Sequence, residues 1–273
     1  MIINVIILTI SFFILGAVIG SFLNVCIVRL PHEQSVVRPR SRCVHCQKPI
    51  FWYDNVPLIS YLFLKGRCRF CRKKISFRYF FVELLTALTF AGFYQYFGLN
   101  ILLIPYLVMT SGFIVAAFVD FEHRIIPDEV SLGGIAAGLI LSLLIPQMHD
   151  FSRAPWAWKH LHSLWLSLLG VLIGGGSIYA MGVAGDFIFK KESMGGGDVK
   201  FLAMIGAFLG WEGALLTFFI APFFGAVFGI IHKIRKNESA IPYGPFLALG
   251  ALIALFWGQR LIALLLGRYG NFM

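Results

Sequence analysis

Long apolar runs constrain what this chain can fold into more than any other feature of its sequence. Most of them are near 20 residues long and contain few charged side chains. A helix needs about 20 apolar residues to cross a bilayer, where its backbone polar groups must be satisfied internally. We therefore expect an all-α polytopic membrane protein. About eight transmembrane helices are predicted, over Ile2–Val28, Tyr79–Phe97, Ile101–Val119, Val130–Ile145, His162–Phe189, Val199–Leu209, Glu212–Ile231 and Tyr243–Leu266. The run after Val199 is short and contains glycine, so seven helices remain the alternative.

The composition excludes several other classes of protein. Hydrophobic residues make up 59% of the chain and charged residues 13%, whereas soluble domains are about half apolar and about a quarter charged. These values exclude an ordinary soluble enzyme, a disordered chain and a free nucleic-acid-binding protein. The formal net charge of +10 therefore needs an explanation other than a nucleic-acid partner.

The distribution of basic residues supplies that explanation. Twelve of the 23 Lys and Arg residues lie between Arg29 and Arg78, seven more lie in loops on the same predicted side, and four lie on the other. Loops on the cytoplasmic side of a membrane carry such an excess. We therefore expect the N-terminus outside, the loop after Arg29 in the cytoplasm, and no nucleic-acid partner.

The polar segment 29–78 is predicted to be a small domain inserted between the first two helices. It contains two Cys-x-x-Cys pairs, Cys43 with Cys46 and Cys68 with Cys71, separated by 21 residues. This spacing is typical of a zinc ribbon, in which each pair places two thiolates on one tetrahedral ion. We expect a structural metal, zinc before iron, because a reducing cytoplasm disfavours the alternative of disulfides. Cys26, within an apolar run, is expected to be a core residue.

Two aspartates stand at the ends of apolar runs, on the predicted cytoplasmic side. Asp120 follows Val119, and Asp198 precedes Val199 in the sequence Gly-Gly-Gly-Asp. Carboxylates beside a membrane span are costly and indicate function. Two that lie close together share a proton, so that one can activate water while the other polarises a carbonyl group, as in aspartic proteases. For each aspartate alone, a helix cap or an ion pair remains the alternative.

Other acids have simpler interpretations. Asp128 follows Pro127 and is expected in the first turn of a helix, and Asp198 could pair with Lys200. Because a proline separates Asp120 from Asp128, one unbroken helix is not expected to present both. Asp186 and Glu83 are further candidates for buried acids.

A series of motifs in order resembles the prepilin peptidases, also called type IV leader peptidases, over nearly the whole chain. A single Gly-x-Gly-Asp would be weak evidence, but the full series is specific. Val44 departs from the family, where proline is often found between the paired cysteines. The motifs are Gly20–Val25 with Arg29–Pro31, Tyr53–Tyr61 between the cysteine pairs, Ile75–Tyr79 with Glu83, Asp120 with Ile126–Asp128, Gly195-x-Gly197-Asp198-x-Lys200, and Pro242–Ala248.

The resemblance implies an aspartic endopeptidase of the bacterial inner membrane, with Asp120 and Asp198 as the catalytic pair. Its substrates would be type IV prepilins or type II secretion pseudopilins, cut on the cytoplasmic side between glycine and usually phenylalanine. Members with the cysteine loop also methylate the new N-terminal amine with S-adenosylmethionine, so we expect this second activity. The supporting residues would be Gly195, Gly197, Lys200, Pro127 and Asp128, and the zinc ligands Cys43, Cys46, Cys68 and Cys71.

The resemblance also suggests an organisation of the chain. Residues 1–28 would form the first transmembrane helix, 29–78 the zinc domain and methyltransferase part, and 79–273 the peptidase domain. Glu83 is a candidate for methyl transfer, but no Rossmann-type glycine fingerprint locates the S-adenosylmethionine site. The basic loop would repel a basic leader, so Glu122, Asp128, Glu129 and Glu192 are expected to contact it. A homo-oligomer remains open.

Three other functions have to be weighed. A proton-coupled transporter could use Asp120, Asp186 and Asp198 as a relay, but these acids cluster at one face, and no inverted repeat is visible. A non-enzymatic scaffold of a pilus or secretion machine would tolerate Asp→Asn substitutions. A presenilin-type protease would not be expected to carry the cysteine loop.

Overall fold

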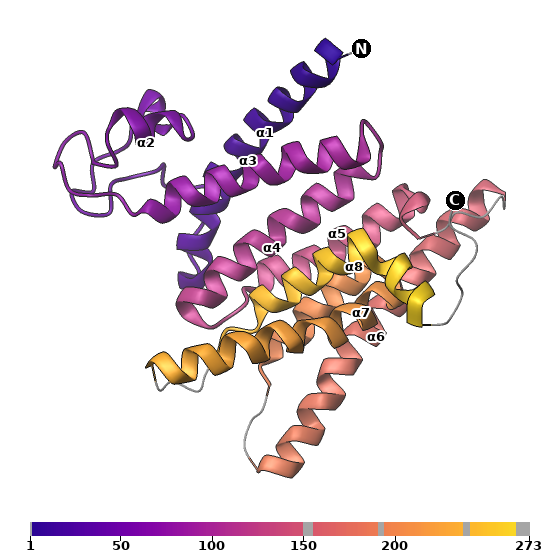
Figure 1. Ribbon diagram of the computed structural model, residues 1–273. Helices are drawn as coiled ribbons and strands as arrows, with labels where there is room; N and C mark the ends of the chain where they lie inside the picture. The colour runs from indigo at the N-terminus through magenta and orange to yellow at the C-terminus, as the bar shows by residue number, and fades with distance from the viewer. Residues whose placement is uncertain (1, 150–154, 191–193, 237–240, 266–273) are drawn as a thin grey trace. The chain divides into compact units, whose positions relative to one another are not determined.

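A computed structural model describes residues 2–149, 155–190, 194–236 and 241–265 of the protein. The described residues form eight α-helices joined by turns and short 3-10 segments (Figure 1). The prediction of an all-α protein is confirmed, and among the described residues each predicted apolar run coincides with a helix or part of one, to within two residues at its ends. The helices are α1 (Ile2–Arg29), α2 (Ile59–Phe63), α3 (Phe77–Phe97), α4 (Leu103–His123), α5 (Asp128–Leu144), α6 (Trp156–Phe189), α7 (Gly196–Lys236) and α8 (Gly244–Leu265).

Six of the described helices are long and apolar enough to cross a membrane. They are α1, α3, α4, α6, α7 and α8; α5 has 17 residues. The two runs predicted after Val199 both lie in α7, and the doubtful boundary between them falls at Gly210, whose φ of 71° interrupts the helical backbone. A glycine tolerates this conformation because it has no Cβ.

The chain divides into two compact units, Met1–Val115 and Ala116–Met273. In the first unit, α1 and α3 pack closely and run antiparallel. A Cβ atom on Gly16 would lie 2.7 Å from Cα of Ala87, and one on Gly20 would lie 2.8 Å from Cα of Glu83. Glycines four residues apart let two membrane helices approach this closely. The spacing of Gly16 and Gly20 in the sequence is a signal for such a contact.

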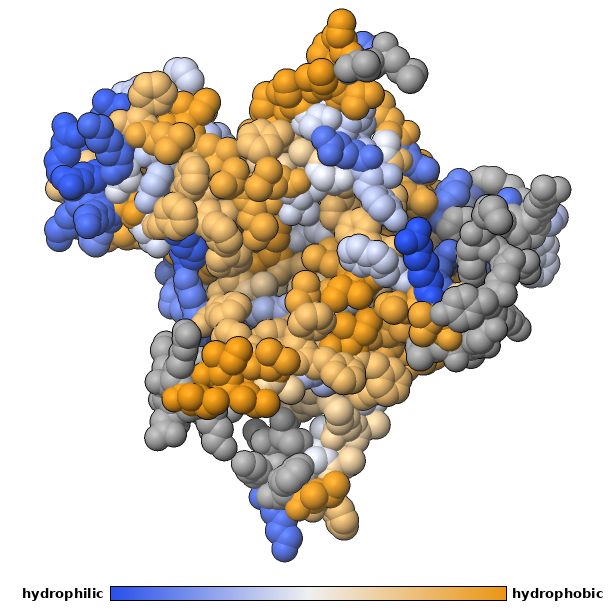
Figure 2. All heavy atoms as spheres, in the orientation of Figure 1, coloured by the Kyte–Doolittle hydropathy of each residue, from blue (hydrophilic) through white to orange (hydrophobic). Residues whose placement is uncertain are grey.

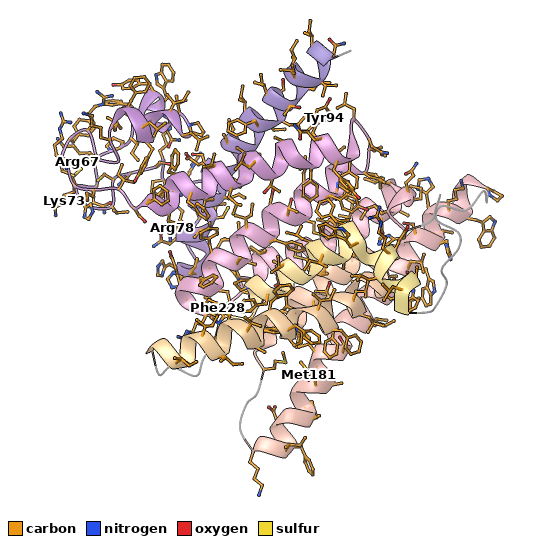
Figure 3. All side chains as sticks on the ribbon, viewed as in Figure 1. Arg67, Lys73, Arg78, Tyr94, Met181 and Phe228 are labelled. Atoms are coloured by element: carbon orange, nitrogen blue, oxygen red, sulfur yellow. The ribbon has the colours of Figure 1, made fainter. Side chains whose placement is uncertain are left out.

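Polar contacts and aromatic packing fix the two ends of this helix pair. At one end, the Asn24 side chain donates to the Tyr79 carbonyl at 2.9 Å, and at the other Phe12 stacks on Tyr94 with ring centroids 4.9 Å apart. Figure 3 shows Arg78 at the beginning of α3 and Tyr94 near its end. The basic end of α3 is therefore the end joined to the cysteine-bearing insertion.

The insertion between α1 and α3 has almost no hydrophobic core. Between Glu33 and Ser76, the buried residues are Cys43, Ser60, Gly66 and Cys68. Its surface is hydrophilic around the loops beside α2, in contrast with the apolar surface of the long helices (Figure 2). Such a segment needs a constraint other than apolar burial to stay folded.

The second unit is built around α7, which packs against α5, α6 and α8. Gly170 of α6 and Gly206 of α7 meet so closely that a Cβ on Gly170 would lie 2.1 Å from the Gly206 carbonyl oxygen. The hydroxyl of Ser167 donates across the same contact to the Ala207 carbonyl at 2.7 Å. Small residues and cross-helix hydrogen bonds thus hold this bundle together, as is usual in a membrane. Fully buried Phe208 forms part of its core.

Candidate functional site

Asp120 lies in the last turn of α4, buried with 5% of its surface exposed. Its Oδ2 atom accepts a hydrogen bond from the backbone N–H of Gly244, the first residue of α8, at 2.8 Å. The first N–H groups of a helix have no partner within the helix and lie at the positive end of its dipole. The beginning of α8 therefore helps to hold this carboxylate, on which the positive charge of Arg124 also acts.

Asp198 occupies the first turn of α7, following the glycine run, and its N–H donates to the Gly195 carbonyl at 3.1 Å. Ile126 joins the two aspartate motifs. A Cβ on Gly197 would lie 3.3 Å from Cβ of Ile126, and one on Gly244 would lie 3.3 Å from its Cδ1 atom. Bare backbone at both positions lets the beginnings of α7 and α8 close around the end of α4.

The charges of Asp120 and Asp198 act on each other. The structure thus brings together two acids that are 78 positions apart in the sequence, through three segments of the second unit: the end of α4, the beginning of α7 and the beginning of α8. Two carboxylates whose charges interact can share one proton. Phe228 of α7, labelled in Figure 3, contacts both Phe121 and Phe246 beside this site.

Tyr243 immediately precedes α8 and has a buried hydroxyl group. Among the described residues this oxygen has no hydrogen-bond partner. Burial, together with the nearby charge of Asp198, raises the pKa of Tyr243 to about 12, so the phenol keeps its proton at neutral pH. The sequence analysis included Tyr243 only as part of a motif, and nothing in the pattern marked its hydroxyl as a spare donor at the aspartate site.

Asp128 and Lys200 form an ion pair at the edge of this site. The Lys200 ammonium donates to both carboxylate oxygens of Asp128, at 2.7 and 2.9 Å. As expected, Asp128 begins a helix directly after Pro127, and the non-helical residues 124–127 separate this helix from α4. Lys200 pairs with Asp128 and not with Asp198, so the ion-pair alternative weighed for Asp198 is not the arrangement found.

The remaining acids lie elsewhere. Asp186 is exposed near the end of α6, which does not favour a buried proton relay. Glu122 of α4 and Glu129 of α5 are exposed, and Glu192 is outside the described residues. Glu83, in the first unit, is partly buried and accepts a hydrogen bond from the Leu58 N–H at 2.7 Å.

The four cysteines converge on one point, as predicted. Cys43 Sγ lies 3.8 Å from Cys71 Sγ, and Cys46 Sγ lies 4.0 Å from Cys68 Sγ; all four sulfurs lie within 4.8 Å of one another. In a tetrahedral site with Zn–S bonds of about 2.3 Å, the sulfurs are about 3.8 Å apart, whereas a disulfide requires about 2.05 Å. The cluster could hold a metal ion, and its geometry fits zinc. Cys26 is separate and buried, as expected.

The two cysteine pairs have the same backbone design. In each, the residue after the second cysteine has a left-handed backbone, Gln47 with φ of 57° and Arg72 with φ of 56°. Their N–H groups donate back to the first cysteine of the pair, at 2.9 and 3.0 Å. The backbone N–H of Cys71 lowers the pKa of the Cys68 thiol to about 7. An ionised thiol is the form that binds a metal.

Comparisons with known proteins agree with both parts of the chain. Residues 14–97 match the model of the bacterial peptidase A24 N-terminal domain, and residues 107–230 match that of the type IV leader peptidase family. The prepilin leader peptidase/N-methyltransferase of Stutzerimonas stutzeri is 34% identical, over 92% of this chain and 91% of that protein. The Pseudomonas aeruginosa protein of the same name is 32% identical, over 91% and 90%.

A third relative of the same name, from Myxococcus xanthus, is 40% identical over 83% of this chain. The match covers 64% of that relative's length, so the Myxococcus protein is the longer of the two. No solved structure matches this chain.

Proposed function

This chain belongs to the type IV leader peptidase family, as a bifunctional prepilin leader peptidase and N-methyltransferase, and we propose that Asp120 and Asp198 are its catalytic pair. One observation carries the proposal: Asp120 and Asp198 lie close enough for their charges to interact, and Asp120 is buried with its Oδ2 atom held by the Gly244 N–H. Asp128 is paired with a lysine and is less suited to this role.

Hydrolysis of the prepilin peptide bond would proceed with one proton shared by the two aspartates. The ionised carboxylate takes a proton from water, which attacks the scissile carbonyl carbon, while the protonated carboxyl donates to the carbonyl oxygen. Collapse of the tetrahedral species breaks the C–N bond, and the leaving amine takes the proton removed from water. We propose that the Tyr243 hydroxyl, which is buried without a described partner and feels the charge of Asp198, donates to the oxygen charge that develops during the reaction.

The aspartates stand at the ends of apolar helices, which suits a substrate with a basic leader followed by an apolar helix. That helix can lie in the bilayer while the scissile bond stands level with the helix ends. The distribution of Lys and Arg supports a cytoplasmic location for this face. Glu122 and Glu129 are exposed acids next to this site, where they can contact a basic leader.

We assign zinc to the four-cysteine cluster. Cys43, Cys46, Cys68 and Cys71 would hold the ion, with no position left for substrate, so the metal would be structural. The methyl donor is proposed to be S-adenosylmethionine, and the acceptor is the amine that cleavage exposes. Because that amine does not exist before cleavage, methylation follows peptide hydrolysis.

The test is to incubate a purified prepilin with the protein in detergent, with and without S-adenosylmethionine, and to weigh the products by mass spectrometry. Wild type should remove the leader and add one methyl group only with the donor. Asp120→Asn and Asp198→Asn should each lower cleavage by at least about 10³-fold. Asp186→Asn, which changes an exposed acid near the end of α6, is the matched control, and this variant should cleave normally.

Either aspartate variant cleaving at the control's rate would refute the assignment of the pair. Wild-type protein that cleaves no pilin-type substrate, while retaining its melting transition, would instead favour the transporter or scaffold function. Cleavage without methylation would keep the peptidase and remove the proposed methyl donor.

A further inference from the structure

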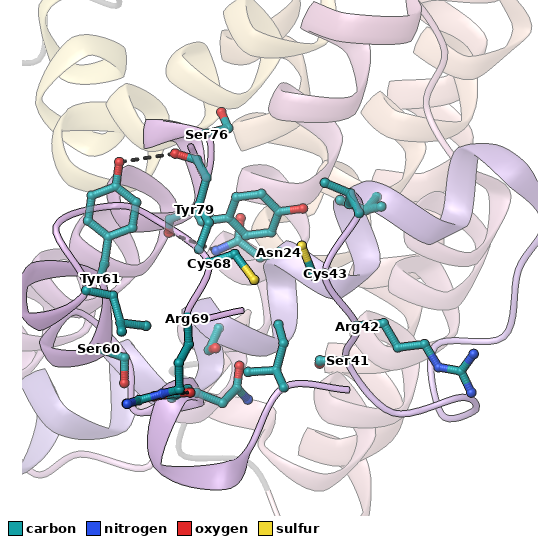
Figure 4. A pocket seen from close by; sticks show the side chains of 18 of the residues that line it. Asn24, Ser41, Arg42, Cys43, Ser60, Tyr61, Cys68, Arg69, Ser76 and Tyr79 are labelled. Atoms are coloured by element: carbon teal, nitrogen blue, oxygen red, sulfur yellow. Dashed lines mark hydrogen bonds and ion pairs between the residues drawn. The ribbon is translucent and has the colours of Figure 1, made fainter. Parts of the chain in front are cut away.

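The first unit contains a cavity of about 820 Å³ that the peptidase chemistry does not use. Its walls come from α1, from the beginning of α3 and from the cysteine-bearing insertion (Figure 4). Sites for small molecules are typically concave, mostly apolar and about 300–1,000 Å³ in volume. The cavity therefore has the size of a site for one small organic molecule.

Asn24 of α1 presents an unused acceptor to this cavity. The residue is 2% exposed, and its Nδ2 atom donates to the Tyr79 carbonyl at 2.9 Å. Its Oδ1 atom is buried and, among the described residues, accepts no hydrogen bond. Figure 4 shows Asn24 beside Tyr79, near Cys43 and Cys68. Buried polar atoms are nearly always satisfied, so this oxygen points to a donor that a ligand brings.

Glu83 of α3 supplies a negative charge to the same wall. Its Oε2 atom accepts from the Leu58 N–H at 2.7 Å, and the Ser21 hydroxyl is a second partner. Both partners are neutral, so they hold the carboxylate without cancelling its charge. The other carboxylate in the lining, Asp54, is instead held by two hydrogen bonds from Arg69, at 2.5 and 2.7 Å.

The loop that holds Glu83 is strained. Leu58 has φ of 61° and ψ of −50°, a conformation that side chains other than glycine seldom adopt. Strained backbone of this kind clusters at sites where the chain must be held in one position. Here it directs the Leu58 N–H to Glu83, next to the cavity.

The lining also has cationic and aromatic groups suited to the rest of an amino-acid-bearing nucleoside. Arg42, Lys48 and Arg78 line it together with the rings of Tyr61 and Tyr79. Aromatic rings accommodate a flat base, and basic side chains accommodate a carboxylate. The cavity thus combines a carboxylate for a cation, basic groups for an anion, and rings for a heterocycle.

We propose that this cavity is the S-adenosylmethionine site, with Glu83 facing the positive charge of the donor and Asn24 Oδ1 accepting one of its N–H groups. The proposal rests on the methyltransferase function assigned above. The bound donor supplies a methyl group on a sulfonium centre. The substrate amine's lone pair would form the new N–C bond as the S–C bond breaks with its electrons left on sulfur, and the methylated nitrogen would then release one proton to water.

Direct binding tests the assignment without relying on turnover. Dissociation constants for S-adenosylmethionine and for its product S-adenosylhomocysteine, which lacks the positive charge, are measured by isothermal titration calorimetry on zinc-loaded protein. Glu83→Gln should weaken S-adenosylmethionine binding at least about tenfold and the product's binding clearly less. Asn24→Leu should weaken both. Asp186→Asn, outside the cavity, should bind both ligands as wild type does.

Cross-linking on wild-type protein covers the case in which a variant fails to fold. Ultraviolet cross-linking of radiolabelled S-adenosylmethionine, followed by peptide mapping, should label residues 21–29 or 42–83. Label confined to α5–α8, or well-folded variants of Glu83 and Asn24 that bind both ligands normally, would overturn the cavity assignment while leaving the methyltransferase function intact. Wild-type protein that neither binds the donor nor methylates a cleaved prepilin would overturn both.

Discussion

Removing zinc from the four-cysteine cluster is expected to weaken S-adenosylmethionine binding by more than about tenfold and to leave leader cleavage nearly unchanged. We expect the insertion to depend on the proposed metal, because its buried residues between Glu33 and Ser76 are two cysteines, one serine and one glycine. Burying a side chain the size of leucine contributes at most about 3 kcal/mol, whereas structural zinc in small domains contributes about 10–16 kcal/mol. The metal would therefore contribute several times more free energy to folding of the insertion than burial of one apolar side chain.

The effect should stop at the boundary between the two units. Cys43 and Cys68 line the cavity of the first unit, so loss of the metal removes one of its walls. We expect the dissociation constant for S-adenosylmethionine to rise more than about tenfold, which is about 1.4 kcal/mol. Asp120, Asp198 and Gly244 all belong to the second unit, so cleavage should fall by no more than about threefold.

The assay compares chelated, zinc-restored and substituted proteins. Zinc content, donor binding, leader cleavage and sensitivity of the insertion to protease are measured on each. Cys68→Ser should behave like the chelated protein, and Cys26→Ala, which also removes a buried thiol from the first unit, is the matched control. Cleavage lost in proportion to zinc would refute the independence of the aspartate site, and donor binding that survives in zinc-free protein would refute the role of the insertion in the cavity.

Three further predictions follow from single contacts. Tyr243→Phe should lower kcat for cleavage by about 10²-fold, as when an oxyanion donor is removed, and Tyr179→Phe, which changes an exposed tyrosine, is the control. Because the pKa of Tyr243 is about 12, its phenol stays neutral below that pH. A fall in cleavage rate that begins below about pH 10 in wild type and disappears in Tyr243→Phe would contradict a neutral phenol. Lys200→Ala should lower the free energy of unfolding, measured by thermal denaturation, by less than about 1 kcal/mol, because the ion pair of Lys200 with Asp128 is exposed. A larger decrease would show that this ion pair stabilises the fold. Gly20→Leu should lower the melting temperature and the free energy of unfolding, the latter by about 1–3 kcal/mol or more from overpacking, because a Cβ at this position would lie 2.8 Å from Cα of Glu83. The same variant should weaken S-adenosylmethionine binding. Unchanged binding would argue against the contact between α1 and α3 as a wall of the site.

Much of the fold was predictable because hydropathy and helix length are local properties. The apolar runs alone located the long helices, and the doubtful boundary near Leu209 and Glu212 coincided with the break at Gly210. The close contacts within each unit depend on which glycines face a neighbouring helix. Gly16 and Gly20 carry a spacing that predicts such a contact, but the partner residues, Ala87 and Glu83, could not be read from it.

The cysteine cluster was predictable for a different reason. Two Cys-x-x-Cys pairs almost define their own geometry, since each pair forms a turn that presents two thiols, and the structure confirms their convergence. The cavity beside them had no such signature. Its Asn24 comes from α1 and its Glu83 from α3, separated by the whole insertion, and no glycine fingerprint marks it. Only the packed structure shows that an oxygen of Asn24 is left without a donor.

The acids show most clearly why sequence could propose roles but not assign them. Asp54 and Asp128 are neutralised by Arg69 and Lys200, while Asp120 and Glu83 accept backbone N–H groups from Gly244 and Leu58.

A carboxylate that accepts a hydrogen bond from a neutral amide can still bind a proton or a cationic ligand, whereas the charge of one paired with a cation is already largely neutralised. These direct hydrogen-bond partners separate Asp120 and Glu83, for which we propose functional roles, from Asp54 and Asp128. The amide partners lie 124 and 25 residues away along the chain. Because nearly every residue has a backbone N–H group, no sequence motif could have shown which one each carboxylate would accept.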